Sequence, residues 1–160
     1  MNSVKILKSQ IEDIDILNHI SFASKKHWGY PDELMELWKE DMLLTESDFE
    51  VQQIYKLVLE EKIIGFCAIQ ELTEAYDVTN LWIEPSHIGK GFGKLLLSFC
   101  IEKVVLNNKP IIVEADPNAE AFYENQGFVT YDQKESLPKG RFLPLMRKES
   151  LTNSDLFDNA

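Results

Sequence analysis

Three glycines at alternate positions lie between a predicted strand and a long apolar helix, and this loop constrains the fold more than any other feature. They are Gly89, Gly91 and Gly93, in the segment SHIGKGFGK. Without Cβ atoms, the backbone here can approach a ligand closely and turn its N–H groups inward. The following helix adds free N–H groups and the positive end of its dipole. The loop predicts a phosphate or pyrophosphate site, and a plain strand-to-helix turn is the alternative.

Two common phosphate-binding loops do not fit this segment. A Walker loop would need glycine at Ile88 and serine or threonine at Leu95. A dinucleotide fingerprint would need its third glycine at Lys94 or Leu96, depending on where it begins. Lys90 and Lys94 would still add positive charge to an anion site in this loop.

Hydrophobic periodicity predicts strands and helices on both sides of the loop. We expect strands at 3–8, 51–59, 63–70, 76–84, 110–115, 128–133 and 142–148, and helices at 10–27, from Pro31 onward, from Phe92 to Asn107 and at 119–126. Strands and helices alternate in the second half, with hairpins around them. This order predicts an α/β fold of mixed α+β character, with a sheet that is parallel only in part.

Size and charge narrow the classes of protein further. The 160 residues suit a single domain, expected at 1–149 and followed by an acidic tail at 150–160. Lysine and arginine number 16 and aspartate and glutamate 27, so the net charge is −11. This balance argues against nucleic-acid and membrane-surface binding, because both need an excess of basic residues.

Cysteine and histidine usage indicates a reducing compartment and no metal site. Cys67 and Cys100 each lie in an apolar run, so we expect buried thiols rather than a disulfide. The three histidines are not clustered with the cysteines, so no zinc site is expected. No apolar run suits a membrane span or a secretion signal, and we expect a cytoplasmic protein.

A second motif, DPNAEAFYENQGF, follows the predicted strand at 110–115. Asp116 before a proline suits a helix N-cap, and Gly127 suits the position after the helix. With the upstream pattern P-x-x-x-G-K-G-x-G-K, this motif resembles the GCN5-related N-acetyltransferase (GNAT) superfamily. The resemblance runs from about residue 4 to 147 and is strongest over 81–128. The segments HWGY at 27–30 and GRFLPLM at 140–146 are similar to a bacterial-type branch of it.

The resemblance implies a GNAT-like twisted mixed sheet of about six to seven strands with four helices. The strand at 81–84 would splay from the strand at 111–114, and acetyl-CoA would lie in the gap as cosubstrate, with no metal. The residues implied to bind acetyl-CoA are Leu81, Trp82, Ile83, Ile88, Gly89, Lys90, Gly91, Phe92, Gly93, Lys94, Asn118 and Tyr123. Ile88 departs from the superfamily, which has arginine or glutamine there; Lys90 and Lys94 could compensate.

The implied reaction is direct transfer of the acetyl group from acetyl-CoA to a primary amine in a ternary complex. It needs a base for the amine proton, a donor for the oxyanion and a proton or hydrogen bond for the leaving thiolate. The resemblance assigns the oxyanion donor to the backbone N–H of Ile83 and the general acid to Tyr123. Asp77, Glu84 and Glu114 are the candidate bases, and the sequence leaves the choice open.

Two further predictions concern aromatic residues. Phe122 and Tyr123 are adjacent and therefore point about 100° apart on a helix, so we expect Phe122 to pack and Tyr123 to face the site. In the family, the region of His27, Trp28 and Tyr30 borders the acceptor pocket; a packed helix-end cluster is the alternative.

The sequence leaves the acceptor and two other functions open. The acidic balance slightly favours a cationic acceptor amine. A CoA-binding regulatory module without catalysis would keep the loop, and Ile88 is the argument for it. An unrelated phosphate-binding domain would require the second motif to be a coincidence. Homodimers are common in the family, so a second copy of the chain is a candidate partner.

Overall fold

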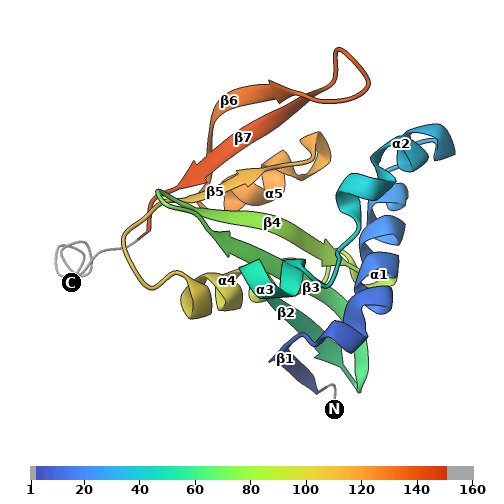
Figure 1. Ribbon diagram of the computed structural model, residues 1–160, viewed down its shortest axis with the longest axis vertical. Coiled ribbons are helices and arrows are strands. Elements are labelled where there is room, and N and C mark those ends of the chain that lie inside the picture. The colour runs from blue at the N-terminus through green and yellow to red at the C-terminus, as the bar shows by residue number, and fades with distance from the viewer. Residues whose placement is uncertain (1–2, 151–160) are drawn as a thin grey trace.

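The computed structural model describes residues 3–150, which form one seven-stranded sheet with helices on both faces (Figure 1). The elements in chain order are β1 (Val4–Lys8), α1 (Ile14–His27), α2 (Asp32–Met42), α3 (Asp48–Val51), β2 (Gln52–Leu59), β3 (Lys62–Glu71), β4 (Tyr76–Ile83), α4 (Phe92–Val104), β5 (Ile111–Glu114), α5 (Glu120–Asn125), β6 (Val129–Glu135) and β7 (Phe142–Lys148). Short 3-10 turns lie at Ile11–Asp13, Pro85–His87 and Pro117–Ala119. The expected mixed sheet is confirmed.

The helices differ from the expectation in one detail. Within residues 3–150 there are five α-helices rather than four, because a single turn, α3, precedes the first long hairpin. Val51 therefore ends a helix and does not begin the predicted strand. The charged turn of that hairpin has Glu60 and Glu61 at φ of 50° and 69°, the twist that a tight hairpin needs.

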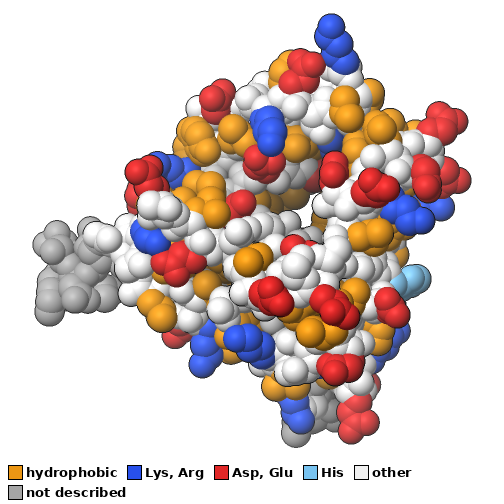
Figure 2. Space-filling view, viewed as in Figure 1, with side chains coloured by type: hydrophobic (Ala, Val, Ile, Leu, Met, Phe, Trp, Pro, Cys, Tyr) orange, Lys and Arg blue, Asp and Glu red, His pale blue; other side chains and the backbone are white. Residues whose placement is uncertain are grey.

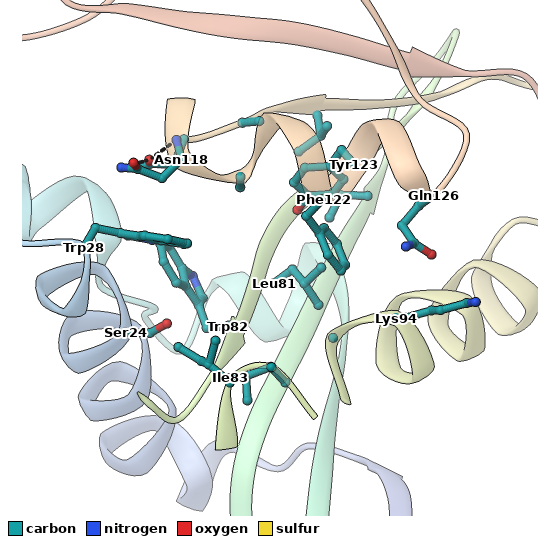
Figure 3. Close-up of a pocket in the computed structure, with 18 of the residues that line it drawn as sticks. Ser24, Trp28, Leu81, Trp82, Ile83, Lys94, Asn118, Phe122, Tyr123 and Gln126 are labelled. Atoms are coloured by element: carbon teal, nitrogen blue, oxygen red, sulfur yellow. Dashed lines mark hydrogen bonds between the residues drawn. The ribbon is translucent and has the colours of Figure 1, made fainter. Parts of the chain in front are cut away.

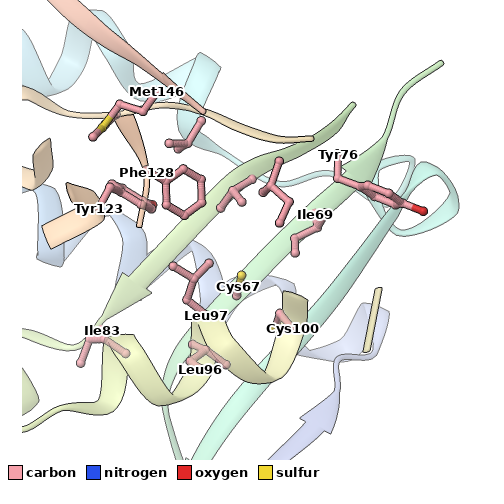
Figure 4. Packing of buried hydrophobic residues seen from close by; sticks show 14 of the residues in the cluster. Cys67, Ile69, Tyr76, Ile83, Leu96, Leu97, Cys100, Tyr123, Phe128 and Met146 are labelled. Atoms are coloured by element: carbon pink, nitrogen blue, oxygen red, sulfur yellow. The ribbon is translucent and has the colours of Figure 1, made fainter. Parts of the chain in front are cut away.

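Alternating side chains place a hydrophobic core on each face of the sheet. On one face, Leu97 and Cys100 of α4 pack with Cys67 of β3 and Tyr123 of α5 (Figure 4). On the other face, α1 packs through Leu17 and its neighbours onto β2 and β3. Both cysteines are free and buried, as expected. The central strands are thus fixed from both sides.

The sheet opens between β4 and β5, its parallel neighbours. They pair only at Tyr76↔Ile111 and Asp77↔Ile112, and β4 continues to Ile83 without a partner on that side. The expected splay of the central strands is confirmed. The N–H of Glu84 donates to Ile64 O (2.7 Å) on the β3 side. Because antiparallel strands alternate in hydrogen-bonding direction, the backbone N–H groups of Leu81 and Ile83 face the gap.

The surface is hollowed between the α1–α2 arm and the α5 side of the sheet, and acidic side chains gather over α2 (Figure 2). None of the helices between residues 3 and 150 has both the length and the apolar character to cross a membrane. The tail predicted at 150–160 lies outside the described residues, apart from Ser150.

Candidate functional site

A cleft of about 540 Å³ passes through the gap between β4 and β5 (Figure 3). Its walls come from the end of α1, the glycine loop with the start of α4, and the segment from β5 to α5. Of the residues expected to bind acetyl-CoA, those that line the cleft are Leu81, Trp82, Ile83, Ile88, Gly89, Gly91, Gly93, Lys94, Asn118 and Tyr123. Lys90 and Phe92 do not line it. The cleft therefore joins both sequence motifs.

The glycine loop keeps a run of backbone donors without partners. Gly89 and Gly91 have φ of 84° and 86°, and a Cβ at either would meet nothing within 4 Å. Glycine is thus required here by backbone conformation, not by space. Gly91 precedes the first turn of α4 and accepts from Leu95 N (3.2 Å). In the hydrogen bonds of residues 3–150, no backbone N–H from Gly89 to Lys94 is used, which leaves a nest for an anion.

Phe122 and Tyr123 both line the cleft, and Tyr123 is the more deeply buried of the two. Tyr123 is only 5% exposed and packs edge-on against Phe122 and Phe128, with ring centroids 5.2 and 5.3 Å away. The structure therefore does not separate the two residues as expected, with Phe122 packed and Tyr123 at the site, because both side chains pack in the core and both line the cleft. Burial, followed by the charges of Cys67 and Asp77, raises the pKa of Tyr123 far above its ordinary value. Its hydroxyl keeps its proton at neutral pH.

Asp77 lies where β4 and β5 part, at their last paired position. Burial, reinforced by the negative charge of Glu114 and opposed by Lys134, raises its pKa to about 6. A carboxylate with a pKa just below neutral is ionised at pH 7 and still basic enough to accept a proton. Asp77 does not itself line the cleft, but Val78, Thr79 and Glu114 around it do.

The other two candidate bases already have cationic partners. Glu114 is half-exposed in the cleft wall, and Lys134 Nζ lies 3.2 Å from its Oε1. Glu84 is at the far end of β4, outside the cleft, with Lys62 Nζ at 3.4 Å and His87 Nδ1 at 3.3 Å. Of the three carboxylates, Asp77 combines burial, a raised pKa and a place at the splay.

The structure places the three aromatic residues at the α1–α2 junction, His27, Trp28 and Tyr30, in different surroundings. Trp28 lines the cleft and is 41% exposed. His27 is exposed and does not line the cleft. Tyr30 lies behind the wall, where its ring packs edge-on against Trp38 with centroids 4.8 Å apart.

Tyr30 belongs to a partly buried polar cluster centred on Asp116, which we call the Asp116 network: Lys25, Tyr30, Asp116, Asn118 and Arg141. Asp116 accepts from Lys25 Nζ (2.7 Å), Arg141 Nη2 (3.2 Å) and Tyr30 Oη (3.0 Å). It also caps the next turn by accepting from Asn118 N (2.9 Å). Burial alone would raise the pKa of Asp116, but Lys25 and the other donors outweigh burial and lower it.

Several cleft residues carry no recognisable signal in the sequence, among them Ser24, Thr79 and Gln126. Asp116 was recognised only as a helix cap, because its cationic partners are far away along the chain. No group of three potential metal ligands occurs in the part of the chain that the structure describes.

Residues 26–150 match the family model described as Acetyltransferase (GNAT) domain. The fold is similar to that of the PaiA N-acetyltransferase from Thermoplasma acidophilum, solved with coenzyme A (21% identity, 92% of this chain and 99% of that chain, TM-score 0.73). It is also similar to a GCN5-related N-acetyltransferase from Rhodopseudomonas palustris (19%, 92% and 96%, TM-score 0.77). A third similar fold is the ribosomal-protein-S18-alanine N-acetyltransferase from Escherichia coli (17%, 97% and 98%, TM-score 0.68). None of the curated proteins matches the chain.

Proposed function

This chain belongs to the GNAT acetyltransferase family, and we propose that it transfers the acetyl group of acetyl-CoA directly to a primary amine. The observation that carries the proposal is the continuity of one cleft. It joins the unpaired N–H groups of the glycine loop to the splay of β4 and β5 and to the wall formed by α1. A cofactor and an acceptor could thus meet there. The PaiA enzyme with this fold was solved with coenzyme A, which agrees with the choice of cofactor.

The cofactor would be held mainly by backbone groups. The N–H groups from Gly89 to Lys94 would bind the pyrophosphate, where they act together with the positive end of the α4 dipole. The free edge of β4 at Leu81 and Ile83 would bind the pantetheine arm. Lys94 lines the cleft and supplies the positive charge that Ile88 does not.

Three groups would divide the chemistry. A free amine with a pKa near 10.4 is protonated at pH 7, which costs roughly 4–5 kcal/mol to reverse. Asp77 would accept that proton through water, because its side chain stands just outside the cleft lining. The amine nitrogen then attacks the thioester carbon, and the backbone N–H of Ile83 would stabilise the oxyanion. The nitrogen gives up its remaining extra proton to water, the C–S bond breaks, and CoA leaves as a thiolate while the amide forms.

Tyr123 would stabilise that thiolate by donating a hydrogen bond. Complete proton transfer from Tyr123 is uphill, because the pKa of its buried phenol is above 10 whereas a thiol has a pKa near 8.5. Hydrogen bonds to charged groups are worth about 1.5–3 kcal/mol. Tyr123→Phe should therefore lower kcat about 10- to 100-fold and change the Kd of acetyl-CoA less than about twofold. Steady-state assays of CoA release would measure kcat, and calorimetry would measure the Kd of acetyl-CoA.

The control for this change is Tyr131→Phe, because Tyr131 is 55% exposed on β6 and does not line the cleft. It should leave kcat unchanged. A Tyr123→Phe enzyme with wild-type kcat over the whole pH range would remove Tyr123 from the mechanism.

Acetyl-CoA binding by calorimetry is the test of the proposed function. We expect micromolar binding by the wild type and at least about a 100-fold loss in Gly91→Val, because the β-branched side chain disfavours the positive φ and crowds the anion nest. Gly140→Val is the matched control: Gly140 also has positive φ (93°) and open space around it, but lies in the β6–β7 turn.

Three results would contradict the proposal. The first is no binding of acetyl-CoA, and the second is pyrophosphate binding as tight as that of CoA. The third is tight binding without consumption of acetyl-CoA in the presence of any amine, which would indicate a regulatory CoA-binding module.

A further inference from the structure

We propose that the acceptor is a primary amine attached to an uncharged aromatic group, and that Trp28 and Trp82 hold this group. The inference rests on the proposed function, since it concerns the acceptor half of the same cleft. It is carried by three features of the α1 side of the cleft, as residues 3–150 form it: two indole rings, no free counter-charge, and a serine hydroxyl that faces the cleft without a partner in the protein.

Two tryptophans from distant parts of the chain face the same space. Trp28 follows the end of α1, and Trp82 lies on β4; both line the cleft, and their indoles lie close together in Figure 3. The Nε1 of Trp82 donates to Asn80 Oδ1 (3.0 Å), so its polar atom is already satisfied. What these residues offer a ligand is therefore flat apolar surface, which favours an aromatic ring.

The charged groups of this wall are compensated within the protein. Asp116 is bound by Lys25 (2.7 Å) and Arg141 (3.2 Å), and neither cation lines the cleft. Glu114 has Lys134 at 3.2 Å. A second ammonium on the acceptor, as in a polyamine, would thus find no unpaired carboxylate among the described residues of this wall.

Among the described residues, two further charged groups near the cleft have other tasks. Asp77 is assigned to the proton of the reacting amine. Lys94 lines the cleft from α4, at the end assigned to the pyrophosphate (Figure 3). His87 also lines the cleft, but its Nδ1 lies 3.3 Å from Glu84 Oε2. Within the part of the chain that the structure describes, an acceptor carboxylate would therefore find no unpaired cation near the indoles, which disfavours amino acids as acceptors.

Ser24 supplies one uncharged polar contact. It is 5% exposed, lines the cleft, and its hydroxyl takes part in none of the hydrogen bonds found between residues 3 and 150. In Figure 3 its oxygen lies beside Trp82. The hydroxyl therefore faces the cleft and is free to donate to, or accept from, a polar atom of a ligand at this wall.

The test measures acetyl transfer to four amines: 2-phenylethylamine, ethylamine, phenylalanine and spermidine, together with a lysine-containing peptide. We expect kcat/KM for 2-phenylethylamine to exceed that of every other amine by at least about tenfold, because only this acceptor offers the indoles an aromatic ring without a second charged group.

Two variants locate the acceptor. Trp28→Ala should raise the KM for 2-phenylethylamine about tenfold or more, and Ser24→Ala should raise it about threefold. Both should leave the Kd of acetyl-CoA within about twofold, because neither residue lies at the glycine loop. The matched control is Phe142→Ala, because Phe142 is 46% exposed on β7 and does not line the cleft.

The outcomes separate the two proposals. A preference for spermidine, phenylalanine or the peptide, or an unchanged KM in Trp28→Ala, would overturn this inference alone and leave the acetyltransferase function standing. Acetyl transfer to none of the amines by a protein that binds acetyl-CoA would overturn both.

Discussion

Asp77→Asn is expected to lower kcat about 100- to 1,000-fold, the usual loss when a general base is removed. Asparagine keeps the shape of the side chain but cannot accept the amine proton. The Kd of acetyl-CoA should change little, because Asp77 does not line the cleft. Steady-state kinetics with saturating amine and calorimetry with acetyl-CoA would measure the two effects. Glu114→Gln is the matched control and should cost less than about tenfold.

The pH dependence gives a sharper version of the same prediction. Because the pKa of Asp77 is raised to about 6, titration of this group should not change kcat above neutral pH. As the pH drops through 6, kcat should fall, which gives the acidic limb of the plot of kcat against pH. Glu114→Gln removes a negative charge that raises this pKa, so the acidic limb should move to lower pH. Lys134→Met removes a positive charge and should move the limb to higher pH. If neither variant moves the acidic limb, the group that titrates there is not Asp77.

Stability should respond in the opposite direction to activity. A carboxyl with a folded pKa near 6 and an ordinary value of 3.8 binds a proton more readily in the folded state. Its ionisation therefore lowers stability as the pH rises from about 4 to 6, and the loss persists above pH 6. Asp77→Asn should thus raise the free energy of unfolding at pH 7 by about 1–2 kcal/mol, after allowance for its partial exposure. Lower stability together with lower activity would indicate a structural role instead.

The features that sequence reasoning predicted are those with local causes. The glycine loop with free backbone N–H groups follows from Gly89, Gly91 and Gly93 between a strand and a helix, and the cap at Asp116 follows from its neighbours Pro117 and Asn118. Hydrophobic periodicity placed the strands and long helices because each buries one face or stripe of residues. The splay of β4 from β5 followed from the family resemblance and not from periodicity.

The features that sequence reasoning could not predict depend on distant contacts. Lys25 and Asp116 are 91 positions apart, and no residue near either one in the sequence indicates that they form an ion pair. Ser24 is a wall residue because of where α1 crosses the sheet. Tyr123 was expected at the site rather than in the core, but α5 is short and its position against α4 and β6 buries this side chain while both it and Phe122 reach the cleft.

Asp116→Asn is expected to lower the free energy of unfolding by about 3–5 kcal/mol, the cost of leaving buried charge without its partner. Lys25 and Arg141 would then remain together, with side chains only 11% and 14% exposed and no carboxylate between them. The same change at the surface is the matched control: Asp32→Asn breaks the exposed pair with Lys26 (3.0 Å) and should cost less than about 1 kcal/mol. Urea denaturation would measure both.

The double variant Asp116→Asn, Lys25→Met shows whether charge is the cause. Removing one of the two cations should restore part of the stability, because it removes a buried charge that has lost its partner. The recovery is only partial, because methionine also loses the contact of the Lys25 ammonium with the Trp38 ring (4.7 Å). The network ties α1 and the α1–α2 junction to the segment after β5 and to the β6–β7 turn, to which Trp38 of α2 also donates, at Leu137 O (2.7 Å). Its loss should therefore loosen the acceptor wall as a unit. If Asp116→Asn costs no more than Asp32→Asn, water must compensate the two cations. The wall would then be held by the Trp38 and Tyr30 rings rather than by charge.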